Sequence, residues 1–194
     1  MLPKGSIAKI YNYYFNSPRY NDDIMSAFRQ FFDQPDLDQG DSIDADQMSD
    51  GLFNEWFLYD FKLTNGETVL VDFISRNPLK ISIIDISLYR NLLTTNTYSL
   101  FEVVTVDIDK GLMLKNLRTK KDVYVHEQKL TRQVQPGDMF FLRVAKVGDN
   151  YEIVGADSFL VGDSNNGVIK KLLLKNDVKF TPKLARDIWA MKQN

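Results

Sequence analysis

The hydrophobic pattern of this chain changes its period at Tyr98, and this change constrains the fold more than any other feature of the sequence. Before Tyr98, apolar side chains recur every three or four residues, which is the pattern of amphipathic helices. After it they alternate, as on β-strands, beginning with the run YSLFEVVTVDI. The sequence therefore predicts an α+β protein with a helical N-terminal half and a β-rich segment from residue 98 onward.

Apolar stripes and capping residues predict five helices before residue 98. Serine and aspartate are good N-caps, a proline is tolerated in the first turn, and Asn-Pro ends a helix. The expected helices are, in chain order, 7–15, a second through Phe31 that begins at Ser17-Pro18, 51–61 capped by Asp50, 69–74 ended by Asn77-Pro78, and one through Leu92 that begins at the capping box Ser82-x-x-Asp85.

Turn signals divide the segment after Tyr98 into five strands. The expected turns are Asp109-Lys110-Gly111, Arg118 to Lys121, Pro136-Gly137 and Gly148-Asp149-Asn150. Five strands in about 65 residues are typical of a small β-barrel of SH3-like or OB-like kind, and a strongly curved antiparallel sheet is the alternative. Gly155, inside the expected last strand, favours the bend of a barrel corner. Two helices, near 168–173 and 182–191, are expected to close the chain.

We accordingly expect three parts. Residues 1–97 form a helical domain with an acidic loop at 33–50, residues 98–163 form the small β-barrel, and residues 164–194 form C-terminal helices that pack on the rest.

The inventory of reactive side chains removes several classes of chemistry. The 194 residues contain no cysteine and one histidine, His126, so thiolate nucleophiles, zinc ribbons and iron–sulfur clusters are excluded. We interpret His126 as a surface or packed residue of a strand. No catalytic residue and no cofactor is assigned. Because no apolar run is long enough for a signal peptide or a membrane span, we expect a cytoplasmic protein that does not enter a membrane.

Acidic side chains are concentrated in DQPDLDQGDSIDADQMSD, at residues 33–50. The stretch resembles a calcium loop only faintly, because a loop that starts at Asp36 has Gln47 where a glutamate is needed. We interpret it as a solvated loop. A carboxylate-metal hydrolase is the remaining enzyme hypothesis, and its candidate ligands are Asp36, Asp38, Asp41, Asp44 and Asp46.

Basic side chains form two groups. Lys115, Arg118, Lys120 and Lys121 lie around one expected hairpin, and Tyr124 is the nearest candidate for base stacking, with Phe140 and Tyr151 as others. The second group comprises Lys170, Lys171, Lys175, Lys179, Lys183 and Arg186. Both groups suit nucleic acid. We prefer the alternative that they solubilise the protein and that the tail pairs with the aspartates of its own chain, since 24 basic and 26 acidic residues give a net charge of −2.

Two stretches resemble a group of uncharacterised bacterial and archaeal proteins. In that group an aromatic helix with an E-W-F core, here Glu55-Trp56-Phe57, precedes a β-unit with a PGD turn, here Pro136-Gly137-Asp138. The similar stretches are 53–74 and 98–155. The resemblance implies a recurring fold and no assigned activity, substrate or cofactor.

The sequence favours a non-catalytic binding or protein-interaction module that uses the barrel surface, with a protein or a small ligand as its unidentified partner. Nucleic-acid binding and carboxylate-metal hydrolysis are the alternatives.

Overall fold

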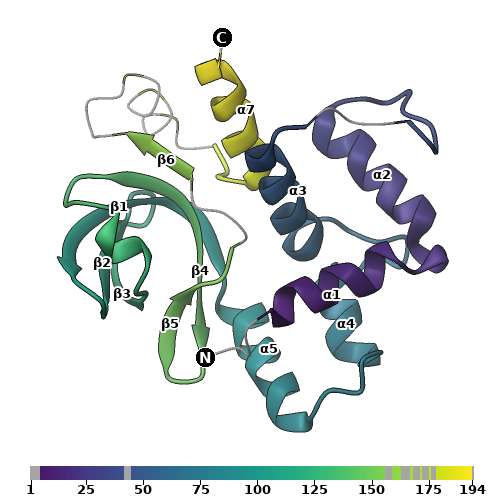
Figure 1. Ribbon diagram of the computed structural model, residues 1–194, viewed down its shortest axis with the longest axis horizontal. Helices are drawn as coiled ribbons and strands as arrows, with labels where there is room; N and C mark the ends of the chain where they lie inside the picture. The colour runs from purple at the N-terminus through teal and green to yellow at the C-terminus, as the bar shows by residue number, and fades with distance from the viewer. Residues whose placement is uncertain are drawn as a thin grey trace.

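The computed structural model describes residues 5–41, 45–155, 159–162, 167, 171, 175 and 178–193. A curved sheet lies on one side and most helices on the other, which confirms the α+β class (Figure 1). The α-helices in these ranges are α1 (Ser6–Phe15), α2 (Asn21–Phe32), α3 (Gln47–Tyr59), α4 (Val69–Arg76), α5 (Ile83–Thr95) and α7 (Pro182–Gln193). The strands are β1 (Thr97–Asp107), β2 (Gly111–Asn116), β3 (Asp122–His126), β4 (Met139–Val147), β5 (Asn150–Ile153) and β6 (Phe159–Gly162). None of the described helices has the length and apolar character that a bilayer crossing requires.

Local capping signals place most helix ends where the sequence predicts them. The Ser82 hydroxyl accepts a hydrogen bond from the backbone N–H of Asp85, and Asn77, whose φ is 44°, is the C-cap of α4. The expected start of α3 is wrong, because the Asp46 carboxylate, not Asp50, accepts the Ser49 backbone N–H at 2.9 Å. The end of the acidic stretch is therefore helical.

The sheet has the strand order β1-β2-β3-β5-β4-β6, and β1 also pairs with β4. The first five strands are thus paired in a closed ring. All are antiparallel except β3 with β5. The expectation of one last strand over 151–161 is wrong: β5 and β6 pair in succession with two parts of β4, Val144–Val147 and Met139–Phe141.

A β-bulge in β1 changes the face on which its side chains lie. The register with β2 shifts between Val103 and Thr105. As a result, Phe101, Val103 and Val106 all pack in the core enclosed by the sheet. Strict alternation from Leu100 to Ile108 therefore fails, because the strand bends there as it passes from its partner β4 to its partner β2.

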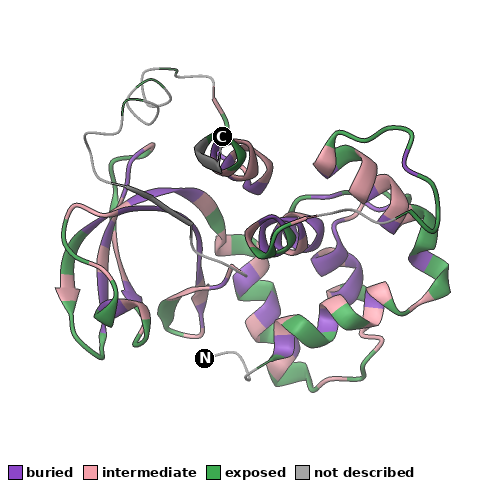
Figure 2. Ribbon diagram, turned by 45° about the horizontal axis from the view of Figure 1, so that its top comes forward, coloured by how far each residue is buried: buried purple, intermediate pink, exposed green. Residues whose placement is uncertain are grey.

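Strand β4 is shared by two hydrophobic cores. Phe140, Leu142 and Val144 point into the core enclosed by the sheet, whereas Phe141 and Ala145 point to the larger core of the helices. Helix α3 lies in the middle of that larger core and is buried on several sides (Figure 2). Burial on both faces makes β4 the element that joins the sheet to the helices.

Helix α7 packs on α3 and is held by the acidic stretch (Figure 1). The Lys183 ammonium lies 2.5 Å and the Arg186 guanidinium 2.9 Å from the Asp33 carboxylate, and the Trp189 ring N–H donates to Asp46 at 3.1 Å. These contacts confirm that the tail pairs with aspartates of its own chain. One C-terminal helix is seen, whereas most of the helix expected near 168–173 falls outside the described residues.

The ion pairs of Asp33 with Lys183 and Arg186, called the Asp33 clasp below, predict that the stability of the fold depends on pH. Hydrogen bonds from Lys183 and Arg186 lower the pKa of Asp33 below its ordinary value of 3.8. A depressed carboxyl pKa stabilises the fold above the unfolded pKa, and this contribution disappears as the pH falls through the folded pKa. Asp33→Asn should therefore lower the melting temperature at neutral pH and flatten its fall in acid.

Circular-dichroism melting from about pH 7 to about pH 2 tests this expectation. Asp149→Asn, in the exposed β4–β5 turn, is the matched control. Identical acid profiles for Asp33→Asn and the unsubstituted chain would show that the clasp contributes nothing to stability.

Candidate functional site

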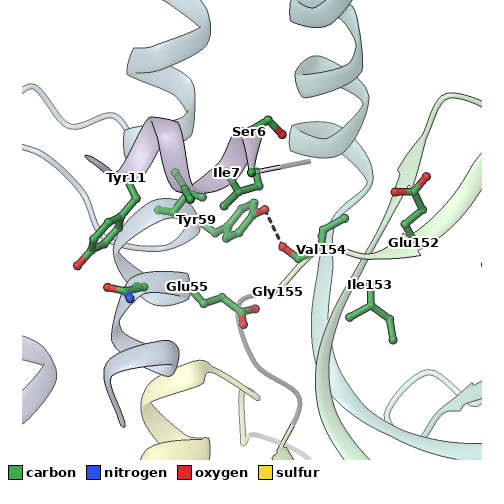
Figure 3. A pocket seen from close by; sticks show the side chains of 13 residues that line it. Ser6, Ile7, Tyr11, Glu55, Tyr59, Glu152, Ile153, Val154 and Gly155 are labelled. Atoms are coloured by element: carbon green, nitrogen blue, oxygen red, sulfur yellow. Dashed lines mark hydrogen bonds between the residues drawn. The ribbon is translucent and has the colours of Figure 1, made fainter. Parts of the chain in front are cut away.

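A cavity of about 440 Å³ lies between α1, α3 and the end of β5 (Figure 3). Helix α1 contributes Ile7, Ala8 and Tyr11, which share one face because Tyr11 lies four residues after Ile7 and three after Ala8. Helix α3 contributes Asn54, Glu55, Leu58 and Tyr59 with the same spacing, and the β5 end contributes Glu152 to Gly155. The cavity thus joins two helix faces to the margin of the sheet.

The position of α1 follows from its fully buried stripe. Ile10 and Tyr14 are 0 % exposed and pack in the core of the helices. The Tyr14 hydroxyl donates to Asp72 at 2.5 Å, which ties α1 to α4. The neighbouring stripe, with Ile7 and Tyr11, is only half-buried and faces the cavity. The stripe with Ile10 and Tyr14 therefore anchors α1 in the core, and the stripe with Ile7 and Tyr11 forms one wall of the cavity.

Behind the cavity, Arg143 of β4 forms a buried polar cluster with one residue inside α3 and with the residues that directly follow α3 and α5. Arg143 is 2 % exposed. Its Nε donates to Glu55 at 2.8 Å, one terminal nitrogen donates to Asp60 at 2.5 Å, and the other donates to the Asn96 side chain at 2.7 Å. Every guanidinium nitrogen thus has a partner.

Aromatic rings complete the surroundings of this guanidinium. It lies 4.4 Å from the ring centroid of Tyr59 and 5.2 Å from that of Tyr98. Burial alone lowers the pKa of Arg143, but the negative charges of Glu55 and Asp60 outweigh it and raise that pKa. Arg143 therefore stays charged, and it fixes the Glu55 carboxylate from behind.

Gly155 makes room for that carboxylate at the cavity wall. A Cβ atom at this position would lie 2.5 Å from a Glu55 oxygen, which is closer than packed atoms allow. Gly155 follows β5, which ends at Ile153, so it does not form a bend inside a strand as the sequence suggested. The adjacent Val154 carbonyl accepts the Tyr59 hydroxyl at 3.1 Å (Figure 3). Both polar side chains of this wall are thereby held in one orientation.

The sequence contains a signal for this cluster that its periodicity does not reveal. Arg143 is one of two charges in the strand MFFLRVAKV, and Glu55 is the one charge in the aromatic helix core. A charge that the surrounding apolar pattern forces inside needs an opposite charge. The sequence shows the positive charge of Arg143 and the negative charge of Glu55, but it does not show that they pair, because the two residues are 88 positions apart.

Three of the predicted basic residues lie close together around the β2–β3 turn, whereas the fourth, Arg118, binds another segment of the chain. Lys120 and Lys121 are exposed in the β2–β3 turn, and Lys115 is half-buried on β2. The Arg118 guanidinium instead donates to the carbonyls of Lys175 and Val178 at 3.0 and 2.7 Å. It also lies 4.6 Å from the Phe180 ring centroid. Arg118 therefore anchors the segment before α7.

Tyr124 lies on the same outer face as Lys115. Lys115 pairs with Asp122 and Met113 with Tyr124, and alternate residues of a strand share a face. The Tyr124 ring lies over Gly111, where a Cβ would come within 2.8 Å of it, and meets the His126 ring edge to face at 5.4 Å. Tyr151 is 39 % exposed. Phe140 is 4 % exposed and packs inside the sheet, so its proposed use for stacking is wrong.

The candidate metal ligands of the acidic stretch have other contacts. Asp46 caps α3, Asp38 lies 3.8 Å from Arg29, and the Asp41 carboxylate accepts the backbone N–H of Asp38. Asp36 is exposed, and Asp44 lies outside the described residues. In the described part of the chain, no three histidine, aspartate or glutamate side chains are grouped to hold a metal ion.

Comparison with known proteins gives one match. A family model described as "Family of unknown function (DUF7986)" matches residues 10–172, which include α3, the PGD turn and each of the described strands. The expected resemblance to a family without an assigned activity is thereby confirmed. The search of curated proteins and the search of solved structures found no match.

The buried cluster predicts a large loss of stability when one partner is neutralised. Glu55→Gln leaves the Arg143 charge buried with one carboxylate in place of two. Breaking a buried ion pair costs about 3–5 kcal/mol of unfolding free energy, and urea denaturation at neutral pH measures it.

The exposed pair of Arg132 and Asp109, 2.7 Å apart, supplies the control. Asp109→Asn breaks an ion pair of similar length in water and should leave the unfolding free energy almost unchanged. Equal effects of the two substitutions would contradict the importance assigned to the buried cluster.

Proposed function

We propose a function for this chain, which belongs to that family of unknown function. It is a non-catalytic binding module that takes a small ligand into the cavity between α1, α3 and β5. The observation that carries the proposal is the cavity itself. Its volume of about 440 Å³ lies within the range of small-molecule sites, and its walls combine apolar side chains with a few fixed polar groups.

The place of the cavity in the fold supports the same proposal. We propose that residues 98–163 form a small closed barrel, the OB-like alternative, because the pairings of β1 to β5 form a ring. Residues 1–97 then form a helical domain and residues 164–194 a C-terminal part. The cavity lies where the first two meet, and ligand sites are frequent at such boundaries.

The polar groups of the wall favour recognition. The Tyr59 hydroxyl donates to Val154 and is therefore oriented before a ligand arrives. The Glu55 carboxylate accepts from Arg143, lies against Gly155 and is 0 % exposed, so it supports the wall from behind. Preorganised groups lose little entropy on binding and therefore select a ligand by shape and charge. His126 lines a different hollow, on the outer side of the sheet.

Filling the cavity should abolish binding. A neutral fluorescent probe, N-phenyl-1-naphthylamine, should brighten with the unsubstituted protein as it enters an apolar site. Ile7→Trp places an indole in the cavity and should weaken the probe affinity roughly tenfold or more. Fluorescence titration measures this change, and circular dichroism checks that the variant is folded.

Ile84→Trp is the matched control, because Ile84 is 72 % exposed and does not line the cavity. It should bind the probe like the unsubstituted chain. Absence of binding to the unsubstituted protein, or unchanged binding to Ile7→Trp, would refute the proposal.

Nucleic-acid binding on the β2–β3 face is a second candidate, which one observation favours. Lys115 and Tyr124 share the outer face there, and Lys120 and Lys121 extend it into the turn. An aromatic ring beside several cations is the arrangement that single-stranded nucleic acids require. Because Arg118 is engaged by the C-terminal segment, the proposed contact set is Lys115, Lys120, Lys121 and Tyr124.

A salt titration tests this candidate. Binding of a fluorescent single-stranded oligonucleotide should weaken with salt, and replacing Lys115, Lys120 and Lys121 by alanine should reduce the slope of log K against log salt by about 2. The charge-matched control replaces Lys9, Lys62 and Arg90, which are exposed on or beside the helices. Equal slopes for both triple variants would exclude this face.

A further inference from the structure

We infer that the hollow on the outer side of the sheet is a second binding site, whose ligand is a neutral oligosaccharide. The hollow has a volume of about 680 Å³ and lies between the β1–β2 turn, β3, the segment after β3 and the end of β5. A ligand in the cavity between α1, α3 and β5 is not required for this inference. Two aromatic rings and the polar groups around them carry it.

Tyr124 provides a flat apolar surface in the hollow. Its ring lies on Gly111 of β2, where a Cβ atom would come 2.8 Å from the end of the ring, so glycine leaves the room that the ring occupies. Tyr124 is half-buried and lines the hollow. The side of the ring that faces away from Gly111 is therefore open to a ligand.

His126 forms a wall beside this surface. The planes of the Tyr124 and His126 rings meet at 86°, and the ring centroids are 5.4 Å apart. His126 is exposed and lines the same hollow, and its imidazole offers an N–H donor in either protonation state. The two rings thus form a corner, in which a ligand that stacks on Tyr124 meets a hydrogen-bond donor at its edge.

The segment after β3 adds further donors and acceptors. The Glu127 Oε1 accepts the backbone N–H groups of Lys129 and Leu130 at 2.7 and 3.1 Å, which fixes the carboxylate and leaves Oε2 as an acceptor. The exposed Gln128 amide is both a donor and an acceptor, and the exposed Lys129 ammonium is a donor. A sugar hydroxyl both donates and accepts, so it needs the two kinds of group side by side. The hollow supplies both beside the aromatic corner.

The charges around the hollow are mixed and partly paired, which favours a neutral ligand. The Arg132 guanidinium donates to both oxygens of Asp109, at 2.7 and 2.9 Å. The Lys110 ammonium lies 3.6 Å from the Asp107 carboxylate. An ionic ligand would meet repulsion as well as attraction here, whereas a neutral ligand can bind polar groups of either sign through hydrogen bonds.

A pyranose ring fits these surroundings. The C–H groups on its faces carry a small positive charge, so they stack on the negative face of an aromatic ring. Its hydroxyls point outward, toward the groups that surround the corner. A nucleobase also stacks on tyrosine, but its phosphates need neighbouring cations, and the carboxylates of Asp109 and Glu127 line the hollow. The hollow therefore favours a sugar over single-stranded nucleic acid, which the second candidate function places at the β2–β3 turn.

Three neutral trisaccharides test the inference: cellotriose, triacetylchitotriose and maltotriose. Their pyranose rings differ in linkage and in substituents, so together they sample the shapes that a stacking site can accept. We expect at least one of them to bind, with saturation-transfer NMR showing the strongest contact at the C–H protons of one ring face. An NMR titration of the sugar that binds best gives its affinity.

Tyr124→Ala removes the stacking surface and should weaken this affinity roughly tenfold or more. Tyr124→Phe keeps the ring and should retain the affinity, because the hydroxyl makes only a 3.5 Å contact with Asp107. Gln128→Ala changes an exposed side chain of the hollow and should weaken binding roughly threefold. Tyr151→Ala is the matched control and should bind like the unsubstituted chain, because Tyr151 is 39 % exposed and does not line the hollow. Circular dichroism checks that each variant is folded.

Each outcome supports or overturns the inference. Failure of all three sugars to bind, or equal affinities of Tyr124→Ala and Tyr151→Ala, would overturn it. Loss of affinity in Tyr124→Phe would also contradict it, since the ring would then not be what the sugar binds. Binding of a single-stranded oligonucleotide that depends on Tyr124, with no sugar binding, would assign the ring to nucleic acid instead.

Discussion

The contact between Arg143 and Glu55 determines how the two halves of this molecule fit together. Arg143 stands on β4, between side chains that point into the core of the sheet, and Glu55 stands on the helix at the centre of the other core. Removing two charges from water is expensive, and only partners with good geometry offset the cost. A small rotation of α3 or a slip of β4 would separate the ions. The pair therefore permits one docking arrangement of helix and strand.

The same arrangement creates the candidate site. The face of α3 that carries Glu55 also carries Leu58 and Tyr59, so the helix rotation that completes the ionic cluster turns these side chains to the cavity. Arg143 holds the carboxylate from behind, and the Val154 carbonyl holds the Tyr59 hydroxyl. Groups that bind a ligand must be supported by a surrounding layer of contacts. Here that layer is also part of what holds the fold together.

The sequence predicts what depends on neighbouring residues and misses what depends on distant ones. The Ser82 cap, the Asn77 stop and the change of period near Tyr98 are local and are found where expected. The bulge after Val103 and the division of the last strand into β5 and β6 follow from strand partners far away in the chain. For the same reason the predicted basic hairpin includes Arg118, whose partners near residue 178 no local pattern identifies.

The absence of a side chain at Gly155 links two positions that are 100 residues apart in the chain. A methyl group there would occupy the place of the Glu55 carboxylate, and the acid could not then both reach Arg143 and border the cavity. The effects of mutations at the two positions should consequently depend on each other. A relative with alanine at the matching position would have to shorten its acid or lose it, and with it this wall of the site. Glycine at one position and glutamate at the other should therefore change together among related chains.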